Sequence, residues 1–447
     1  MSLNVFVRGK PVAVLDSPDG FAHVLSYRPE ATPEDFVSLL MPVRTESWRW
    51  PTLHPFFQIS LPEGFLLAVL KEQIGPHLGA SPLDLLAVVG SNMVGRVQLS
   101  AGDAVKTREV PFKLKQLLHG DNSPQVFLAL VRAHAASGVS GVVPKFLTPE
   151  AQSLFRKASL RTERYIVKGS SDRLPFIAMN EHLCMEVARH TGCPVPRTEV
   201  SDDGQALVVE RFDTDPSTRE RLGFEDMCSL LGLSTDEKYD STWERVARKS
   251  SEFVSAGNLR QAQEQLAITL LLTYALGNAD CHTKNLGLVY SSANDVHLAP
   301  IYDMLSIRVY DSYVSNPPGM AIDGRKTWTP GKTLWRVLQQ HMGIEPAQQR
   351  SLVDKVAEAM VEVMPDLIRR TKETPGFAVV GDRMVREWNV GLARIRERIS
   401  VPVPDFEAMA SDAGVTSASP PASHVPERVG QSPLLASPRR RKPASAA

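Results

Sequence analysis

The first hundred residues combine strand-like and helix-like hydrophobic patterns. Leu3, Val5 and Val7 occupy every second position, which is typical of a β-strand with one buried face. A turn and a second apolar run, at residues 12–15, predict an antiparallel partner for this strand. Apolar spacing and a serine cap further predict helices over 62–74 and 82–89, followed by a strand over 96–99. We therefore predict a small α/β module over residues 1–105.

Residues 106–214 are predicted to form a second small unit, entered through a polar linker over residues 100–125. Tyr165 to Lys168 is a β-rich run that ends in a lysine, and residues 180–190 have the apolar face of a helix. Residues 205–213 contain a buried strand that runs into a polar break.

From residue 215 to about residue 400 the pattern is mostly helical. The longest apolar helix covers residues 259–276, and Gly277 stands where a helix needs a left-handed stop. Two short apolar runs then flank a polar turn at residues 291–295 and predict a hairpin. The segment 401–447 is rich in Pro, Ser and Ala and is predicted to be a disordered tail that carries a basic cluster at residues 439–442. The predicted fold class is therefore α+β.

The composition limits the classes of protein to which this chain can belong. The chain has 447 residues, of which 43% are hydrophobic and 22% charged, as in an ordinary globular protein of two or three domains. Fifty basic and fifty acidic residues leave no net charge, so nothing drives the whole chain toward nucleic acid or a membrane. The four cysteines form no metal-binding spacing, and the N-terminus lacks the pattern of a signal peptide. We expect a cytoplasmic protein with no membrane partner.

The candidate chemistry lies in the loop between the long helix and the hairpin. This loop contains Asp280, His282, Lys284 and Asn285, and Asp303 follows the hairpin. In protein kinases an Asp in such a loop accepts the proton of the substrate hydroxyl, while an Asn five residues later and an Asp after a hairpin hold Mg²⁺. A metal site built from Asp280 and His282 is the rival interpretation, but two ligands are too few for zinc. The kinase interpretation is favoured.

Other kinase-like features precede this loop in the order that kinases have them. Residues 137–145 form a glycine-containing loop without the Walker pattern, and Lys168 ends its strand. Glu181 and Glu186 flank the apolar face of the next helix on opposite edges, so periodicity does not choose which one pairs with Lys168. The strand at 205–213 fits the hinge between two lobes. Each feature alone has a plainer interpretation: a hairpin turn, a solvated edge lysine or an ordinary core strand.

Taken together, these motifs resemble the HipA-type toxin kinases of bacterial toxin–antitoxin systems, over residues 1 to about 400. The stretches that carry the resemblance are Leu61-Pro62-Glu63-Gly64, Ser140-Gly141-Val142-Val143-Pro144-Lys145, Tyr165-Ile166-Val167-Lys168, Asn180-Glu181, Val209-Glu210-Arg211-Phe212-Asp213, Gly277-Asn278-Ala279-Asp280-Cys281-His282-Thr283-Lys284-Asn285 and Tyr302-Asp303. The resemblance implies a two-lobed, protein-kinase-like fold, with the N-terminal module of the family over 1–105, an N-lobe over 106–214 and a helical C-lobe over 215–400.

The resemblance also implies a role for each site residue. Asp280 would be the catalytic residue, and Asn285 and Asp303 would hold Mg²⁺. The ATP-binding residues implied by the matching motifs are Ser140, Gly141, Lys168, Glu210, Phe212, Asp213, His282, Lys284 and Tyr302. Among these, Lys168, His282 and Lys284 would face the phosphates, while Glu210 and Phe212 would present hinge backbone to adenine.

Members of this family phosphorylate an aminoacyl-tRNA synthetase on serine or threonine and are neutralised by a helix-turn-helix antitoxin, through which they reach DNA. The same function is the expectation here, with an ATP-binding co-repressor scaffold as the alternative. Some members carry two regulatory serines in the glycine loop. Here the first position is Gly138 and the second is Ser140, which leaves Ser140 as the candidate for autophosphorylation.

Overall fold

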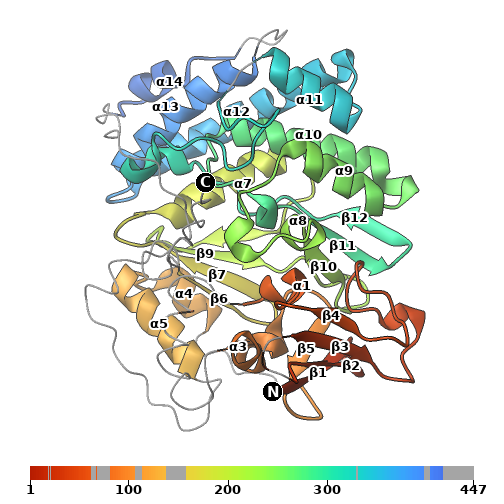
Figure 1. Cartoon of the computed structure of the whole chain (residues 1–447). Helices are drawn as coiled ribbons and strands as arrows, with labels where there is room; N and C mark the ends of the chain where they lie inside the picture. Colours follow the sequence, from red (N-terminus) through yellow and green to blue (C-terminus); the bar gives the residue numbers. More distant parts are fainter. Residues whose placement is uncertain are drawn as a thin grey trace, which may run out of the picture.

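A computed structural model of the chain describes residues 1–18, 20, 22–61, 67, 81–105, 113–136, 158–328, 331–396 and 403–415. The predicted helix over 62–74 lies outside the described residues except for Leu67. The glycine loop, with Ser140 and Gly141, and the basic cluster at 439–442 lie outside them as well. Figure 1 shows the N-terminal sheet at one end of the molecule and the long helices at the other.

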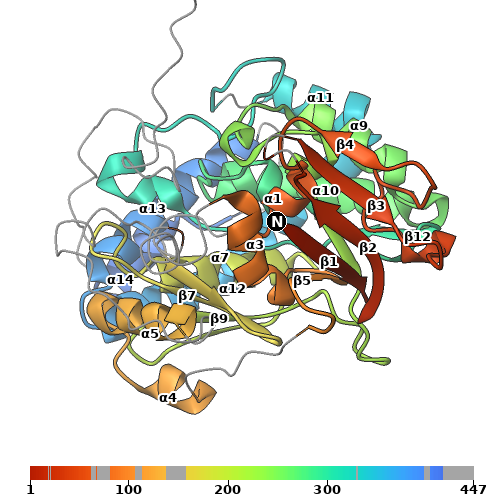
Figure 2. The ribbon, with the colours of Figure 1, turned by 60° about the horizontal axis from the view of Figure 1, so that its bottom comes forward.

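The N-terminal module is built on a five-stranded antiparallel sheet, which Figure 2 brings forward. Its strands are β1 (Ser2–Val7), β2 (Lys10–Asp16), β3 (His23–Tyr27), β4 (Trp48–Trp50) and β5 (Val97–Ser100), in the order β4-β3-β2-β1-β5. The predicted alternation is confirmed, because Leu3, Val5 and Val7 share one buried face. The predicted serine cap is also confirmed: Ser81 accepts from the N–H of Asp84 at 3.2 Å and begins α3 (Pro82–Val89). A short helix, α1 (Pro55–Gln58), precedes it.

The N-lobe is a four-stranded antiparallel sheet with a helical layer on each face. Its strands are β6 (Ala158–Arg161), β7 (Tyr165–Gly169), β8 (Thr198–Val200) and β9 (Ala206–Glu210), in the order β6-β7-β9-β8. Side chains alternate along β9, so that Val208 packs with α5 (Pro124–Ala136) and Leu207 with α7 (Ile177–His190). The linker predicted over 100–125 is wrong in part, because α4 (Leu114–His119) lies there and buries Leu117 and Leu118.

The C-lobe is mostly helical, as predicted, and has one small sheet. Its helices are α8 (Met227–Leu230), α9 (Trp243–Phe253), α10 (Leu259–Ala275), α11 (Lys332–Met342), α12 (Pro346–Glu373), α13 (Ala378–Ile395) and α14 (Phe406–Asp412). Its sheet holds β10 (Gly223–Asp226), β11 (Gly287–Ser292) and β12 (Asp295–Leu298). Single turns of 3-10 helix lie at Pro33–Asp35, Gly90–Asn92, Thr235–Glu237, Ala256–Asn258, Thr283–Asn285, Ile307–Val309 and Asp311–Tyr313. Among the described residues, no helix is both long and apolar enough to cross a membrane.

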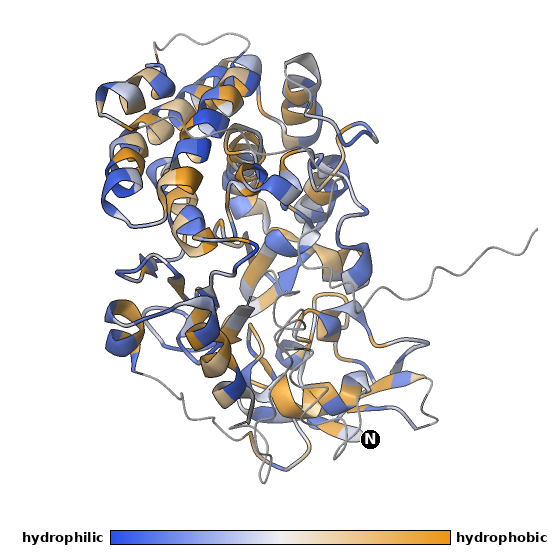
Figure 3. Cartoon of the chain, turned by 90° about the vertical axis from the view of Figure 1, so that its left-hand side faces the viewer, coloured by the Kyte–Doolittle hydropathy of each residue, from blue (hydrophilic) through white to orange (hydrophobic). Residues whose placement is uncertain are grey.

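Helix α10 is the centre of the C-lobe. Every residue from Gln265 to Ala275 is buried, whereas the outer helices carry both hydrophobic and hydrophilic positions (Figure 3). Helix α13 approaches it so closely that a Cβ on Gly391 would lie 1.9 Å from the carbonyl oxygen of Ala275. Only glycine permits this approach, and the close packing holds the end of α10 in place.

The tail prediction over 401–447 fails for residues 403–415. Asp405 caps α14 by accepting from the N–H of Glu407 at 2.9 Å, and Phe406 is fully buried within the main core of the C-lobe. The cap and the buried aromatic side chain help to attach this short helix to α13, although the surrounding composition is that of a disordered segment.

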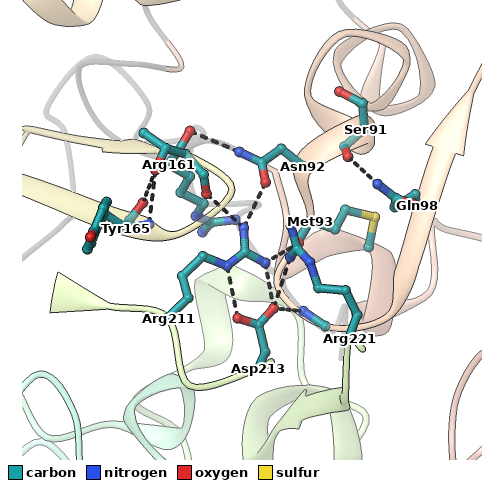
Figure 4. A network of polar contacts seen from close by, with 11 residues as sticks. Ser91, Asn92, Met93, Gln98, Arg161, Tyr165, Arg211, Asp213 and Arg221 are labelled. Atoms are coloured by element: carbon teal, nitrogen blue, oxygen red, sulfur yellow. Dashed lines mark hydrogen bonds and ion pairs between the residues drawn. The ribbon is translucent and has the colours of Figure 1, made fainter. Parts of the chain in front are cut away.

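The N-terminal module contacts the segment that joins the two lobes (Figure 4). The guanidinium of Arg211, just after β9, donates to the carbonyl of Met93 at 2.7 Å and to the side chain of Asn92 at 2.7 Å. It also pairs with Asp213 through two hydrogen bonds, of 2.9 and 2.5 Å. The module is therefore bound directly to the connection between the lobes.

Asp213 is the acceptor at the centre of this network. Its carboxylate, 1% exposed, also accepts from the N–H of Gly95 at 2.6 Å and pairs with Arg221 at 3.2 Å. Burial raises the pKa of this carboxyl, but the hydrogen bond and charge of Arg211 outweigh burial and lower it, so the carboxylate is ionised. The side chain predicted to bind ATP is thus committed to packing the module against the lobes.

A second buried carboxylate joins the module to the small sheet of the C-lobe. Glu225, on β10, accepts from the hydroxyl of Ser38 at 2.7 Å and the N–H of Leu39 at 2.6 Å, both from the module. The hydroxyl of Tyr290, on β11, donates to it at 2.9 Å. Because β11 leads away from the Asp280 loop, this contact fixes the module next to the candidate site.

Candidate active site

The candidate site lies where the two lobes meet, and its residues come from four separate segments of the chain. Lys168 comes from β7 and Glu181 from α7, both in the N-lobe. Asp280 to Asn285 follow α10, and Asp303 follows β12, both in the C-lobe. The site therefore requires both lobes to be in place.

Lys168 is held between two carboxylates. Its ammonium group pairs with Glu181 at 2.5 Å and also with Asp303. Lys168 shares a face of β7 with Ile166, which packs on the α7 side of the sheet, and this alternation directs it toward Glu181. Burial lowers the pKa of Lys168, but the charges of Asp303 and Glu181 outweigh burial and raise it, so the group stays cationic.

The pairing of Lys168 with Glu181 decides a question that the sequence left open. Glu186 lies further along the same helix and pairs instead with Arg189, at 3.2 Å. The side chain of Glu181 is 5% exposed, whereas that of Glu186 is 26% exposed. Only the buried glutamate is within reach of the lysine.

The Asp280 loop is shaped by two residues that precede it. Gly277 ends α10 with φ +68°, the left-handed conformation that its position predicted. A Cβ there would lie 2.4 Å from the side chain of Glu387 on α13. Asn278, 1% exposed, then accepts from the N–H of Asp280 at 3.1 Å. The backbone at Asp280 is therefore fixed by a local turn.

Asn285 and Asp303 meet at one point. The amide nitrogen of Asn285 donates to Asp303 at 3.0 Å, and its amide oxygen accepts from the N–H of His282 at 3.0 Å. Asp303 has φ +55°, a conformation that costs energy for a residue other than glycine, and residues with such strain cluster at functional sites. One oxygen of Asp303 thus faces Lys168 and the other faces Asn285.

This pair fits Mg²⁺. Amide and carboxylate oxygens are suitable ligands, and Mg²⁺ is usually held by one or two carboxylates together with waters and substrate phosphates. No cluster of three or more His, Cys, Asp or Glu side chains in the described residues is placed to hold a metal by itself. For Asn285 and Asp303 to hold Mg²⁺ together, the amide oxygen of Asn285, which now accepts from the N–H of His282, would have to face the cation in place of the amide nitrogen.

An aromatic group lies beside these polar residues. The ring of Tyr302 is stacked on Phe212 with centroids 5.4 Å apart, and Phe224 lies 6.1 Å from Tyr302. The hydroxyl of Tyr302 donates to the carbonyl of Lys284 at 3.0 Å. Burial, and then the carboxylates of Asp226 and Asp303, raise the pKa of Tyr302 well above its usual range, so the hydroxyl remains a neutral donor.

The structure brings together most of the residues that the sequence singled out. Those around the junction of the lobes are Lys168, Phe212, Asp280, His282, Lys284, Asn285, Tyr302 and Asp303. Glu210 ends β9 at the same junction, where its N–H donates to the carbonyl of Arg197 at 2.9 Å. The carboxylate of Asp213 lies in the module interface instead, and Ser140 and Gly141 are outside the described residues.

Two contacts of the described structure were not predicted from the sequence. Arg211, which binds the N-terminal module, belongs to the predicted hinge motif, but the sequence predicted no contact for its side chain. Tyr239 donates to Asp280 at 2.5 Å from a loop that carries no motif. The strand-end position of Arg211 could have marked it as a contact, but Tyr239 lies 41 residues before Asp280 and only folding brings the two together.

Known proteins resemble this chain in sequence and in fold. A family model of the HipA-like C-terminal domain matches residues 137–364, and one of the HipA N-terminal domain matches residues 3–100. The chain is 27% identical over 354 residues to "Putative kinase Y4mE" of Sinorhizobium fredii, covering 74% of this chain and 83% of that protein. It is also 27% identical to "Putative kinase Y4dM" of the same organism, covering 57% of this chain and 63% of that protein.

A solved structure shows the same fold. It is HipA of the Shewanella oneidensis MR-1 toxin–antitoxin system, in a complex with HipB and operator DNA. The two chains superpose with a TM-score of 0.65 at 18% identity, covering 90% of this chain and all of the HipA chain. The predicted α+β fold with a helical C-lobe is therefore confirmed. Because the C-terminal family model alone spans more than half of the chain, and the N-terminal model covers the module, this protein belongs to the HipA family.

Proposed function

We propose that the protein is an ATP-dependent serine/threonine protein kinase that acts as the toxin of a toxin–antitoxin pair. The observation that carries the proposal is the pairing of Lys168 with both Glu181 and Asp303, next to Asn285 and Asp280. A lysine bound to a helix glutamate, beside an Asp/Asn pair, is the arrangement by which protein kinases hold and transfer a phosphoryl group.

Each residue has a role in the proposed transfer. The ammonium of Lys168 binds the phosphates of ATP, and Glu181 keeps it oriented. Asp280 accepts the proton of a serine or threonine hydroxyl as its oxygen bonds to the γ-phosphorus, and the bond from that phosphorus to the oxygen of ADP breaks. Asn285 and Asp303 hold Mg²⁺, which supplies charge neutralisation at the phosphates. Phe212 and Tyr302 offer an aromatic surface beside the hinge for the adenine base.

The names of similar proteins support the partners that we propose. Two relatives are named as kinases, and the HipA of similar fold was solved with HipB and operator DNA. We propose a helix-turn-helix antitoxin as the partner of this chain, with DNA reached only through that complex. We also propose an aminoacyl-tRNA synthetase as the substrate and the cytoplasm as the location, on the family resemblance of the sequence motifs.

Labelled ATP tests the proposal directly. The purified chain is incubated with γ-labelled ATP and Mg²⁺, and phosphoproteomics after brief expression identifies the cellular substrate. Transfer of label to protein supports a kinase. Tight ATP binding without any transfer would instead support a co-repressor scaffold.

Autophosphorylation is part of the same proposal. A phosphate on Ser140 would add about −1.5 to −2 charge and compete with ATP for the backbone donors of a phosphate-binding loop. We propose that Ser140 is the autophosphorylated residue, because position 138 is glycine. Peptide mapping by mass spectrometry should find phosphate on Ser140 in the wild type and none in Asp280→Asn. An unmodified Ser140 in active protein after long incubation with ATP would contradict this role.

A further inference from the structure

Tyr239 makes a hydrogen bond to the residue proposed as the catalytic base. It lies between the 3-10 turn Thr235–Glu237 and α9, and its side chain is buried, with 3% of the residue exposed. Its hydroxyl donates to a carboxylate oxygen of Asp280 at 2.5 Å. No sequence motif includes this tyrosine, and it comes from a different part of the chain than the other site residues.

The position of Tyr239 is fixed by its surroundings. Its ring meets that of His282 edge to face, with centroids 5.0 Å apart. The ammonium of Lys326 donates to its carbonyl oxygen at 2.6 Å. The preceding carbonyl, of Lys238, accepts from both the N–H and the hydroxyl of Thr283, at 3.1 and 2.8 Å. The tyrosine is thus attached to the Asp280 loop through neighbouring residues as well as through its own hydroxyl.

The carboxylate of Asp280 requires such support. The terminal torsion of an aspartate side chain has a broad, weakly determined minimum, so the backbone alone does not orient the two oxygens. The N–H of Asp280 is held by Asn278, which fixes the main chain but not the carboxylate. A hydroxyl donor on a rigid ring constrains the orientation of the carboxylate.

We propose that Tyr239 is a positioning residue that orients the carboxylate of Asp280 for proton acceptance, an inference that rests on the proposed kinase function. Small displacements of a catalytic group raise a reaction barrier, because the reacting atoms must approach with aligned geometry. The hydroxyl of the tyrosine donates to the base, whereas its ring packs against His282, so removal of the hydroxyl alone should affect the chemical step and leave ATP binding nearly unchanged.

Removal of the single hydroxyl tests the proposal. We expect Tyr239→Phe to lower kcat by about 10- to 100-fold at unchanged KM for ATP, since a misplacement of about 1 Å can cost 100-fold. The rate is that of label transfer from γ-labelled ATP to the full-length chain itself, measured at saturating Mg²⁺ over ATP concentrations that extend to saturation. Nucleotide binding, measured by calorimetry with ADP and Mg²⁺, should stay within about twofold of the wild type, because phenylalanine keeps the ring that packs against His282.

The matched control is Tyr310→Phe. Tyr310 is also buried, and its hydroxyl donates to the carbonyl of Pro175 at 3.1 Å, so the same atom is removed from a buried hydrogen bond outside the site. Both variants should lose thermal stability, but only Tyr239→Phe should lose kcat. A merely structural role for Tyr239 would make the two variants alike.

A double variant completes the test. If Tyr239 acts through Asp280, then Tyr239→Phe should cause no further loss in an Asp280→Asn background, because residues that act as a unit are not additive. Wild-type kcat in Tyr239→Phe would overturn the inference and leave the kinase proposal standing. A wild-type chain that binds ADP but transfers no label would overturn both.

Discussion

The ammonium group of Lys168 and the carboxylate of Asp303 form an ion pair that joins the two lobes, although 135 residues separate them in the chain. Lys168 belongs to the N-lobe sheet, and Asp303 follows the C-lobe hairpin. In the proposed function Lys168 binds the phosphates of ATP and Asp303 binds the Mg²⁺ that accompanies them. Their contact therefore places the phosphate-binding and the metal-binding side chain at the same point. A rotation that moved the two lobes apart would separate them.

Asp280→Asn should abolish phosphoryl transfer without unfolding the protein. Asparagine retains an oxygen that can accept from Tyr239 but cannot take a proton, and general-base catalysis is typically worth about 10²- to 10⁴-fold. The measurement is label transfer from γ-labelled ATP, with thermal unfolding as the check on folding. Asp366→Asn is the control, because Asp366 pairs with Arg369 and Arg370 on α12, outside the site. Activity near the wild-type rate in Asp280→Asn would refute the assignment of the base.

Asp303→Asn should remove the dependence of nucleotide binding on Mg²⁺. The wild type should bind ATP more tightly with Mg²⁺ than without it, since a carboxylate is the main protein ligand proposed for the cation. In the variant, Lys168 keeps Glu181 as a partner, so binding without metal should change little. Calorimetric titrations with and without EDTA give both affinities. An unchanged response to Mg²⁺ would show that Asp303 is not a metal ligand.

Asp213→Asn should reduce stability and leave the nucleotide affinity nearly unchanged. The substitution leaves the guanidinium of Arg211, whose side chain is 1% exposed, without its ionised partner. Removing one member of a buried ion pair typically costs about 3–5 kcal/mol. Urea unfolding measures this loss, and calorimetry with ATP measures binding. A large loss of ATP affinity in a variant of normal stability would restore Asp213 to the nucleotide site.

Stability should fall as the pH rises through the range in which Glu225 ionises. Burial raises the pKa of Glu225 from 4.5 to about 7, against the effect of its bonds to Leu39, Ser38 and Tyr290. Between pH 4.5 and about pH 7, Glu225 therefore keeps its proton in the folded state, whereas the same carboxyl has lost its proton in the unfolded state. The stabilisation is complete below about pH 4.5 and is lost progressively up to about pH 7, at about 1.4 kcal/mol per unit of pKa shift.

Glu225→Gln isolates this effect from other groups. Glutamine cannot ionise, so urea unfolding at pH 5 and pH 8 should show a smaller loss of stability in the variant than in the wild type. The wild type and the variant share every other titrating group. Equal losses in the two proteins would show that Glu225 is ionised throughout the range.

Phe406→Ala should destabilise the C-lobe. Phe406 is fully buried against the core, and deleting a buried phenylalanine side chain typically costs about 3–5 kcal/mol. Val390→Ala, on the exposed side of α13, should have little effect, because Val390 is 48% exposed. The comparison of the two unfolding midpoints tests whether α14 is part of the folded lobe. Equal midpoints would leave α14 without a role in stability.

Local features of the site could be predicted from the sequence, because the interactions that form them are local. Gly277 ends a helix through its own backbone preference, and the alternation along β7 directs Lys168 to one face of a sheet. The spacing of Asp280 and Asn285 follows from one loop. Hydrophobic periodicity and turn residues report such features within about 20 residues of the chain.

Only the tertiary structure decided which residues meet across the chain. Helical periodicity left Glu181 and Glu186 equivalent, and the packing of α7 on the N-lobe sheet brought only Glu181 to Lys168. The hinge motif suggested a nucleotide role for Asp213, but the docked module surrounds its carboxylate with Arg211 and Gly95. Tyr239 could not be found at all, since its bond to Asp280 depends on how two loops pack against each other. Sequence patterns carry the preferences of neighbouring residues, whereas side chains from distant segments find their partners only when the core that positions them has formed.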